Sequence, residues 1–452
     1  MSLKLLPRSD ADWLGRVFWN ASAAEGADLA PEDPLALDYL GQQVGYWLFG
    51  AFTTRTSRAQ YFPIVLYGLE LAGSHPPAAL PPTDAERVAR FERWERFWAL
   101  SVLQFNGGPL PRRHEDAFRG VRGANHAWSD SGGRLPLDFT LISRQSELGA
   151  LGAYLSALRD TGLVHPGTLR PSPAAEEILA SFWDERGAGA RTNSYKTYSQ
   201  RAVEGDDAVP RNFGGVTLRA IGERSRLSSL VARQRREQQD RLWEALFVRA
   251  RDDTLELAGL LREASSRRTG PPSPREFLER AVDQTRPSKS SDRVRSKLEF
   301  ALRFGEAARQ LLGQFDAMYR SVSERGWAAP ADAVARDTFG STTLAPFRSA
   351  LRAVLDHQLS VEMQRLPMHG QRALSLFDQV QTGTAGEVMR LLLDYHDAVQ
   401  KDRQRGAGWI RIEGGDLVLS VTSYRGHEKA ARFPTFKLDV VQSLLRDLGR
   451  LS

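Results

Sequence analysis

Apolar residues recur at spacings of three and four along most of this chain, the periodicity of helices that bury one face. The stretch from Thr83 to Leu103 is the clearest example. Thr83 followed by Glu86 is the signature of a capping box, and the aromatic residues of the stretch share one face. Because the same periodicity fills the second half, we expect a mainly α, multi-helix protein with a helical bundle over residues 216–405.

Residues 137–186 carry a more specific pattern. One predicted helix buries a face made of Leu148, Leu151, Leu155 and Leu158. Gly162 marks the end of this helix, Thr168–Arg170 is a short extended piece, and Ser172 followed by proline suits the start of another helix. The order of helix, glycine stop, short strand and helix predicts an internal winged-helix-like module.

Near the C-terminus the pattern changes from helical to alternating. Residues Trp409–Val421 alternate apolar and polar positions around Gly414, Gly415 and Asp416, which predicts a small β-hairpin. The predicted organisation is an N-terminal helical domain, a Gly-rich loop, the winged-helix-like module, an irregular linker, the helical bundle, and a hairpin followed by a helix. The corresponding ranges are 1–105, 106–136, 137–186, 187–215, 216–405 and 406–452.

Composition adds two constraints. The 452 residues include no cysteine, which excludes disulfides, thiolate metal sites and cysteine nucleophiles. The net charge is +6, and only seven of the 61 basic residues are lysines. This arginine excess indicates either a nucleic-acid partner or the codon usage of a GC-rich genome. The N-terminal stretch breaks at Pro7, and no apolar run is long enough to cross a bilayer, so we expect a soluble, cytoplasmic protein without a membrane partner.

A search for catalytic motifs finds none. The eight histidines give no metalloprotease pattern, and phosphate-loop, dinucleotide-binding, kinase and hydrolase motifs are missing from the sequence. Asp394, His396 and Asp397 come nearest to a ligand cluster, but Asp394 and His396 would point to different helix faces. Glu428 and Lys429 are adjacent, whereas a restriction-type nuclease core needs them separated by one residue. The sequence therefore favours a non-catalytic protein without a metal or cofactor.

Arginines supply the candidate binding residues. Arg55 and Arg58 lie in a hydroxyl-rich turn suited to a phosphate, although such arginines also pair with carboxylates or cap carbonyls in helical hairpins. If the winged-helix-like module reads duplex DNA, the phosphate contacts come from arginines in the module and in the loop before it. These are Arg119, Arg122, Arg144, Arg159 and Arg170.

Taken in order, five features of the chain resemble a family of uncharacterised bacterial proteins encoded in phage-defence islands. They are the turn Thr53–Phe62, the aromatic helix around Trp94–Trp98, the loop Gly120–Gly123, the block Ser143–Trp183 and the hairpin Trp409–Val421. The resemblance implies an accessory, non-catalytic role in a multi-gene defence system, either in engaging DNA or in binding a partner. With the winged-helix-like module, the leading hypothesis is a DNA-binding or DNA-sensing subunit of an antiphage complex that takes double-stranded DNA as ligand, and the candidate partner proteins are a helicase, methylase or nuclease. A protein–protein scaffold and an unrecognised metal-dependent nuclease are the alternatives.

Overall fold

The computed structural model describes ten stretches of the chain. They are residues 33–75, 80–128, 134–183, 190–205, 208–232, 235–250, 252–266, 272–285, 291–367 and 369–451. All seven arginines singled out above lie within these stretches. The first 32 residues of the predicted N-terminal domain lie outside them.

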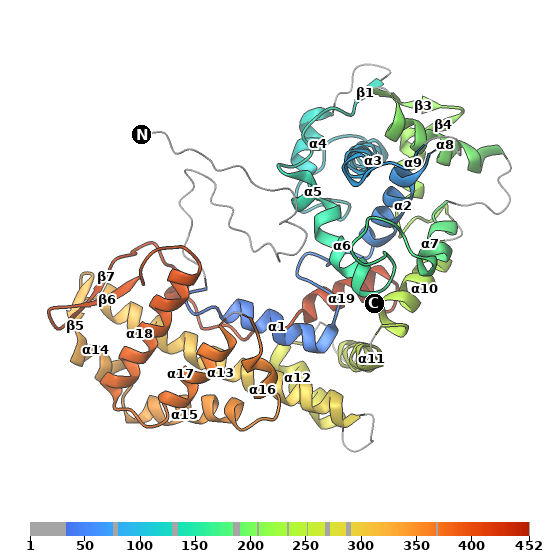
Figure 1. Cartoon of the computed structure of the whole chain (residues 1–452). Coiled ribbons are helices and arrows are strands. Elements are labelled where there is room, and N and C mark those ends of the chain that lie inside the picture. The colour runs from blue at the N-terminus through green and yellow to red at the C-terminus, as the bar shows by residue number, and fades with distance from the viewer. Residues whose placement is uncertain are drawn as a thin grey trace, which may run out of the picture.

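The described residues are mainly helical, as predicted, and the strands are short (Figure 1). The helices are α1 (Leu37–Phe49), α2 (Tyr61–Gly73), α3 (Asp84–Phe105), α4 (Val121–Ala127), α5 (Gln145–Leu148), α6 (Ala150–Asp160), α7 (Glu176–Ala180), α8 (Ala190–Glu204), α9 (Leu218–Arg224), α10 (Arg235–Trp243), α11 (Asp252–Ser266), α12 (Pro274–Gln284), α13 (Ser291–Ser323), α14 (Ala331–Thr338), α15 (Ser341–Leu355), α16 (Ser360–Gln364), α17 (Gly370–Gln379), α18 (Ala385–Asp402) and α19 (Leu438–Asp447). Shorter helical turns are η1 (Pro173–Ala175), the π-helical η2 (Glu244–Val248) and η3 (Gly426–Glu428). The strands are β1 (Arg134–Pro136), β2 (Ala208–Pro210), β3 (Asn212–Phe213), β4 (Val216–Thr217), β5 (Ala328–Pro330), β6 (Ile410–Glu413) and β7 (Asp416–Leu419).

The elements form two lobes (Figure 1). The first lobe contains α2 to α10 with β1 to β4, and the second lobe contains α12 to α18 with β5 to β7. Between them, α1 packs against α13 and α11, and α11 also contacts η2 of the first lobe. Helix α19 returns to the first lobe, where Asp447 pairs with Arg58. The chain therefore crosses between the lobes more than once.

Helix α3 organises the core of the first lobe. Thr83 and Glu86 form the predicted capping box, each side chain accepting the backbone N–H of the other residue. Trp94 is fully buried and donates its indole N–H to the carbonyl of Ile64 at 2.9 Å. A Cβ on Gly68 of α2 would lie 2.2 Å from the Trp94 ring, so only glycine permits this close packing. The aromatic face of α3 therefore serves the core.

The helix stop and the helix start predicted in residues 137–186 are confirmed, but the predicted leucine helix is divided at Gly149 into α5 and α6, and Leu148 and Leu155 are only half-buried. Gly162 ends α6 with φ of 72°, and the Leu163 N–H donates to the carbonyl of Leu158 at 2.8 Å, the bond of a glycine stop. Ser172 caps η1 by accepting the N–H of Ala174. Within the described part of this block the strand pairing is a single antiparallel bridge, Val164 to Pro171, and the predicted extended piece Thr168–Arg170 forms no strand.

This block is an integral part of the first lobe. The ring of Tyr154 on α6 lies 5.1 Å from those of Tyr61 and Phe62 on α2. Phe182, after α7, stacks on Tyr67 with ring centroids 4.2 Å apart. Because residues of α2 contact both α6 and Phe182, the apolar side chains of residues 137–186 named here pack into the core of the first lobe.

Two segments expected to be irregular contain regular structure. Helix α4 lies within 106–136, and α8, β2 and β3 lie within 187–215. Tyr198 of α8 is buried against Phe97 of α3 at 5.0 Å, a contact between residues far apart in sequence that periodicity cannot reveal. Helix α9 also packs on α3, whereas we expected it within the helical bundle.

The predicted C-terminal hairpin is confirmed as β6 and β7, which pair antiparallel through a turn at Gly414 and Gly415 with φ of 58° and 96°. Strand β5 adds to β7, giving a three-stranded sheet in the order β5-β7-β6. The sequence of β5, Ala-Ala-Pro, carries no alternation, which is why the hairpin pattern did not predict this strand.

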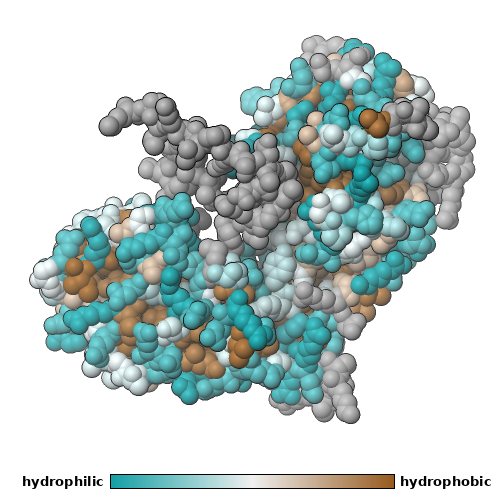
Figure 2. Space-filling model, viewed as in Figure 1, coloured by the Kyte–Doolittle hydropathy of each residue, from teal (hydrophilic) through white to brown (hydrophobic). Residues whose placement is uncertain are grey.

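The surface and the helix lengths bear on the membrane question. On the face drawn in Figure 2, hydrophilic residues cover most of the coloured surface, and apolar residues form small separate patches. In the part of the chain that the structure describes, no helix combines the length and the apolar character needed to span a bilayer.

Candidate nucleic-acid interface

Residues 53–60 form the turn between α1 and α2 in which we predicted a phosphate site. The Thr56 hydroxyl donates to the carbonyl of Thr53 and accepts its N–H, both at 2.9 Å. The side chain of Gln60 donates to the carbonyl of Ser225 at the end of α9, at 2.8 Å. The turn is therefore fixed both internally and against the neighbouring helix.

Arg58 is a structural link at this turn. Its Nε lies 3.2 Å from the carboxylate of Asp447 on α19, and its Nη1 donates to the carbonyl of Glu115 at 2.9 Å. The same Asp447 oxygen accepts the N–H of Ala59 at 2.8 Å. The sequence left two roles open for Arg58, binding a phosphate or a structural role. The structure shows the structural role, because Arg58 pairs with a carboxylate and caps a carbonyl.

Arg119 is anchored beside the turn that carries Arg55. Arg119 is held in place, because its N–H donates to the hydroxyl of Tyr61 at 2.6 Å and its Nη1 donates to the carbonyl of Leu148 at 3.1 Å. Arg55 is half-buried, and burial together with the charge of Arg119 lowers the pKa of Arg55. Guanidinium groups placed on neighbouring segments can both bind the oxygens of one oxyanion.

Two more of the predicted arginines lie on segments packed beside this pair. A Cβ on Gly123 of α4 would lie 2.3 Å from the carbonyl oxygen of Leu141, so α4 packs backbone to backbone on the turn before α5. Arg122 in the first turn of α4 is exposed, and exposed Arg144 pairs with Glu147 at 3.1 Å. We define the arginine cluster as Arg55, Arg119, Arg122 and Arg144.

Arg159 and Arg170 lie at the opposite end of α6, whose 11 residues span about 16 Å. Arg159 donates to the carbonyl of Thr168 at 2.7 Å, and burial lowers the pKa of Arg159, so this side chain braces the loop after α6. Arg170 is exposed on that loop, close to Arg87. The structure therefore joins the predicted phosphate turn to Arg119 and separates both from Arg159 and Arg170.

Sequence reasoning missed Glu95, the acidic residue that positions the N-terminal end of α6. The Glu95 carboxylate accepts the N–H of Ala150 at 2.7 Å and the side-chain amide of Gln145 at 2.8 Å. Burial raises the pKa of Glu95 to about 7, while these two hydrogen bonds oppose the shift. The available signal was an acidic residue beside Trp94 on the aromatic face of α3, where a carboxylate needs a buried partner.

The nearest candidate for a metal ligand, His396, has a structural role. Its Nε2 accepts the N–H of Trp409 at 2.9 Å, so Nδ1 carries the proton and donates to the carbonyl of Pro34 at 2.8 Å. Asp397 accepts the N–H of Gly408 and pairs with Lys401. Both ring nitrogens of His396 thus make hydrogen bonds within the protein, and neither is available to a metal ion.

Among the residues that the structure describes, no group of three histidine, aspartate or glutamate side chains could hold a metal ion. The chemistry offered by the arginine cluster is the binding of oxyanions through guanidinium groups. Comparison of the chain with family models, curated proteins and solved structures finds no match.

Proposed function

We propose that this chain binds duplex DNA as a non-catalytic, cytoplasmic subunit of a bacterial antiphage system, and that the arginine cluster contacts the phosphate backbone. The observation that carries the proposal is that Arg119 is fixed beside the turn that carries Arg55, because its backbone N–H donates to the hydroxyl of Tyr61 at 2.6 Å. Guanidinium forks match the geometry of phosphate oxygens. The net charge of +6 and the predominance of arginine over lysine support the same ligand.

Binding of this kind has a measurable salt dependence. Each phosphate neutralised on duplex DNA contributes about −0.9 to the slope of log affinity against log salt, so four contacts give about −3 to −4. Arg170, on the loop that follows the C-terminal end of α6, supplies a further phosphate contact on the same duplex. The interface reads the backbone rather than base edges, which leaves sequence selection to a partner such as a helicase, methylase or nuclease.

Fluorescence anisotropy with a labelled duplex, from 50 to 200 mM salt, tests the proposal. We expect Arg55→Ala combined with Arg122→Ala to weaken binding at least about tenfold and to reduce the salt slope by about 2. Arg119 is left intact because it also supports the carbonyl of Leu148. Arg352→Ala is the matched control, since Arg352 is an exposed arginine of the second lobe paired with Asp356 at 2.9 Å.

Four results would contradict the proposal. Affinity that does not change with salt, or that the double variant leaves unaltered, rules out the arginine cluster as a phosphate contact. Metal-dependent cleavage of the duplex by the purified chain would show a nuclease instead. Stable co-purification with a helicase, methylase or nuclease in the absence of DNA binding would favour the scaffold.

A further inference from the structure

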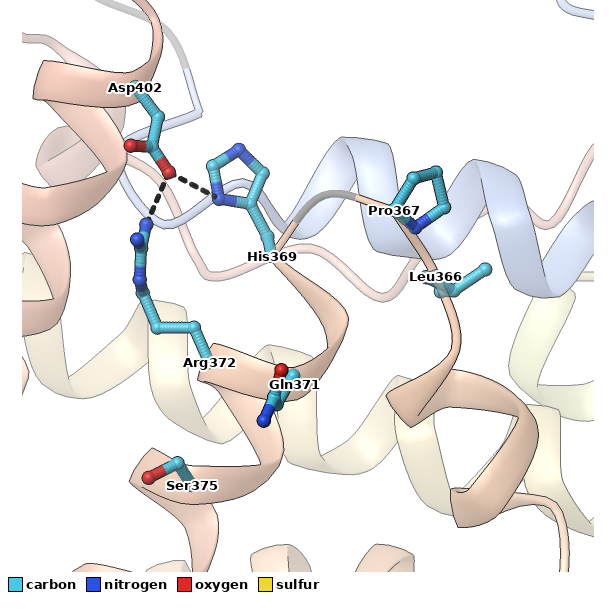
Figure 3. Close-up of a pocket in the computed structure, with 7 residues that line it drawn as sticks. All are labelled: Leu366, Pro367, His369, Gln371, Arg372, Ser375 and Asp402. Atoms are coloured by element: carbon cyan, nitrogen blue, oxygen red, sulfur yellow. Dashed lines mark hydrogen bonds and ion pairs between the residues drawn. The ribbon is translucent and has the colours of Figure 1, made fainter.

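A polar pocket of about 630 Å³ opens in the second lobe, where the chain passes from α16 into the first turn of α17 (Figure 3). It is lined by Leu366, Pro367, His369, Gln371, Arg372, Ser375 and Asp402. Asp402 comes from the end of α18, so two helices contribute its charged groups. The pocket lies outside the arginine cluster of the first lobe.

His369 is the unusual residue of this pocket. Its side chain is only 1% exposed, yet neither ring nitrogen has a hydrogen-bond partner within the described stretches. Its ring points toward Asp402 (Figure 3), but Nδ1 and the carboxylate are 3.7 Å apart, which is too far for a hydrogen bond. Leaving such a buried group unpaired is unfavourable, because it has lost its hydrogen bonds to water. A ligand that bonds to the ring would remove this cost.

The first turn of α17 adds positive potential at the same place. His369 is its N-cap residue and has a left-handed backbone with φ of 59°, and its side chain does not cap the helix. The first N–H groups of a 10-residue helix and its dipole therefore face this end. Arg372 lies within the first turn and pairs with Asp402.

We propose that this pocket binds a phosphoryl group, held by the Arg372 guanidinium, the N–H groups at the start of α17 and the imidazole N–H of His369. In the structure Asp402 is the anion that occupies this positive field, through its ion pair with Arg372. An incoming phosphate dianion competes with Asp402 for that guanidinium. Gln371 and Ser375 lie on the rim, where they supply neutral hydrogen-bonding groups to the rest of an organic phosphate (Figure 3).

Because Arg372 and Asp402 carry opposite charges, removing each of them should change phosphate affinity in opposite directions. The full-length chain is titrated by calorimetry with inorganic phosphate and, separately, with phenyl phosphate. Arg372→Ala should weaken binding at least about tenfold, because a charge-assisted contact is lost. Asp402→Asn should strengthen binding several-fold, because the competing carboxylate is gone and Arg372 is released. Tighter binding of phenyl phosphate would identify an organic monoester as the ligand, and equal binding would identify free phosphate.

Arg352→Ala, on the same lobe, is the control and should bind both probes as the wild type does. A second readout is the imidazole of His369 followed by NMR, whose titration should shift to higher pH in the presence of phosphate because a bound anion stabilises its charged form. The proposal is overturned if neither probe binds, if Arg372→Ala binds as the wild type does, or if Asp402→Asn weakens binding.

Discussion

Two regions of the second lobe each bury a histidine, and they treat it in opposite ways. On α18, His396 is fully buried, and its two ring nitrogens join Pro34 before α1 to Trp409 before β6. At the start of α17, His369 is almost as buried, but neither of its nitrogens has a hydrogen-bond partner within the described residues. Burial alone therefore does not distinguish a structural histidine from a candidate ligand-binding histidine. The distinguishing feature is whether the two ring nitrogens have hydrogen-bond partners.

The largest effect should come from breaking the satisfied histidine. We expect His396→Ala to lower the free energy of unfolding by about 3–5 kcal/mol, because it leaves a cavity and strands the buried N–H of Trp409. The carbonyl of Pro34 loses one of its two donors and keeps the side-chain amide of Gln400 at 3.2 Å. Urea denaturation at pH 7 measures this loss. His126→Ala, at an exposed histidine of α4, is the control and should change stability little.

The same histidine should give stability a pH dependence. Burial lowers the pKa of His396 to about 4, so between pH 6.5 and 4 the unfolded chain binds a proton that the folded chain does not. The stability of the wild type should therefore fall with decreasing pH in this window, by about 1.4 kcal/mol per unit from this group. His396→Ala should lack that component. Equal pH slopes in the two proteins would show that His396 is protonated in the fold.

A second unsatisfied group lies between the lobes. Lys437 is 2% exposed, and its Nζ lies 3.2 Å from the ring centroid of Tyr46 on α1, with no hydrogen-bond partner among the described residues. Burial lowers the pKa of Lys437 to about 6, and the charge of Asp160 opposes this shift. We expect Lys437→Met to stabilise the protein by about 1–3 kcal/mol at pH 7, since an unpaired buried amine is removed.

The sign of the pH effect makes this prediction specific. Between pH 6 and 10 the unfolded chain binds the lysine proton and the folded chain does not, so wild-type stability rises with pH. The advantage of Lys437→Met should consequently shrink as pH rises toward 10, in parallel urea titrations of the two proteins. An advantage that stays constant would mean that Lys437 remains charged, held by the ring of Tyr46.

The sequence predicted those features whose causes are local. The capping box of Thr83 and Glu86, the glycine stop at Gly162 and the Gly414–Gly415 turn each follow from residues a few positions apart. The contacts that build the candidate sites are not local. Arg58 meets Asp447 across 389 positions, and His396 meets Pro34 across 362. Periodicity shows which face of a helix is buried but not which residues that face contacts, so the hydrogen bond that places Arg119 beside the turn of Arg55 could not be predicted.

The smallest expected change is also the one that decides the comparison. His369→Leu removes an imidazole that makes no hydrogen bond within the described stretches, so its stability cost should stay within about 1 kcal/mol, mainly from placing leucine at φ of 59°. The stabilisation that phosphate confers on the wild type, measured as a shift in Tm, should nevertheless decrease in this variant. A loss comparable to that of His396→Ala would instead mean that His369 supports the fold, and its unpaired nitrogens would then carry no information about a ligand.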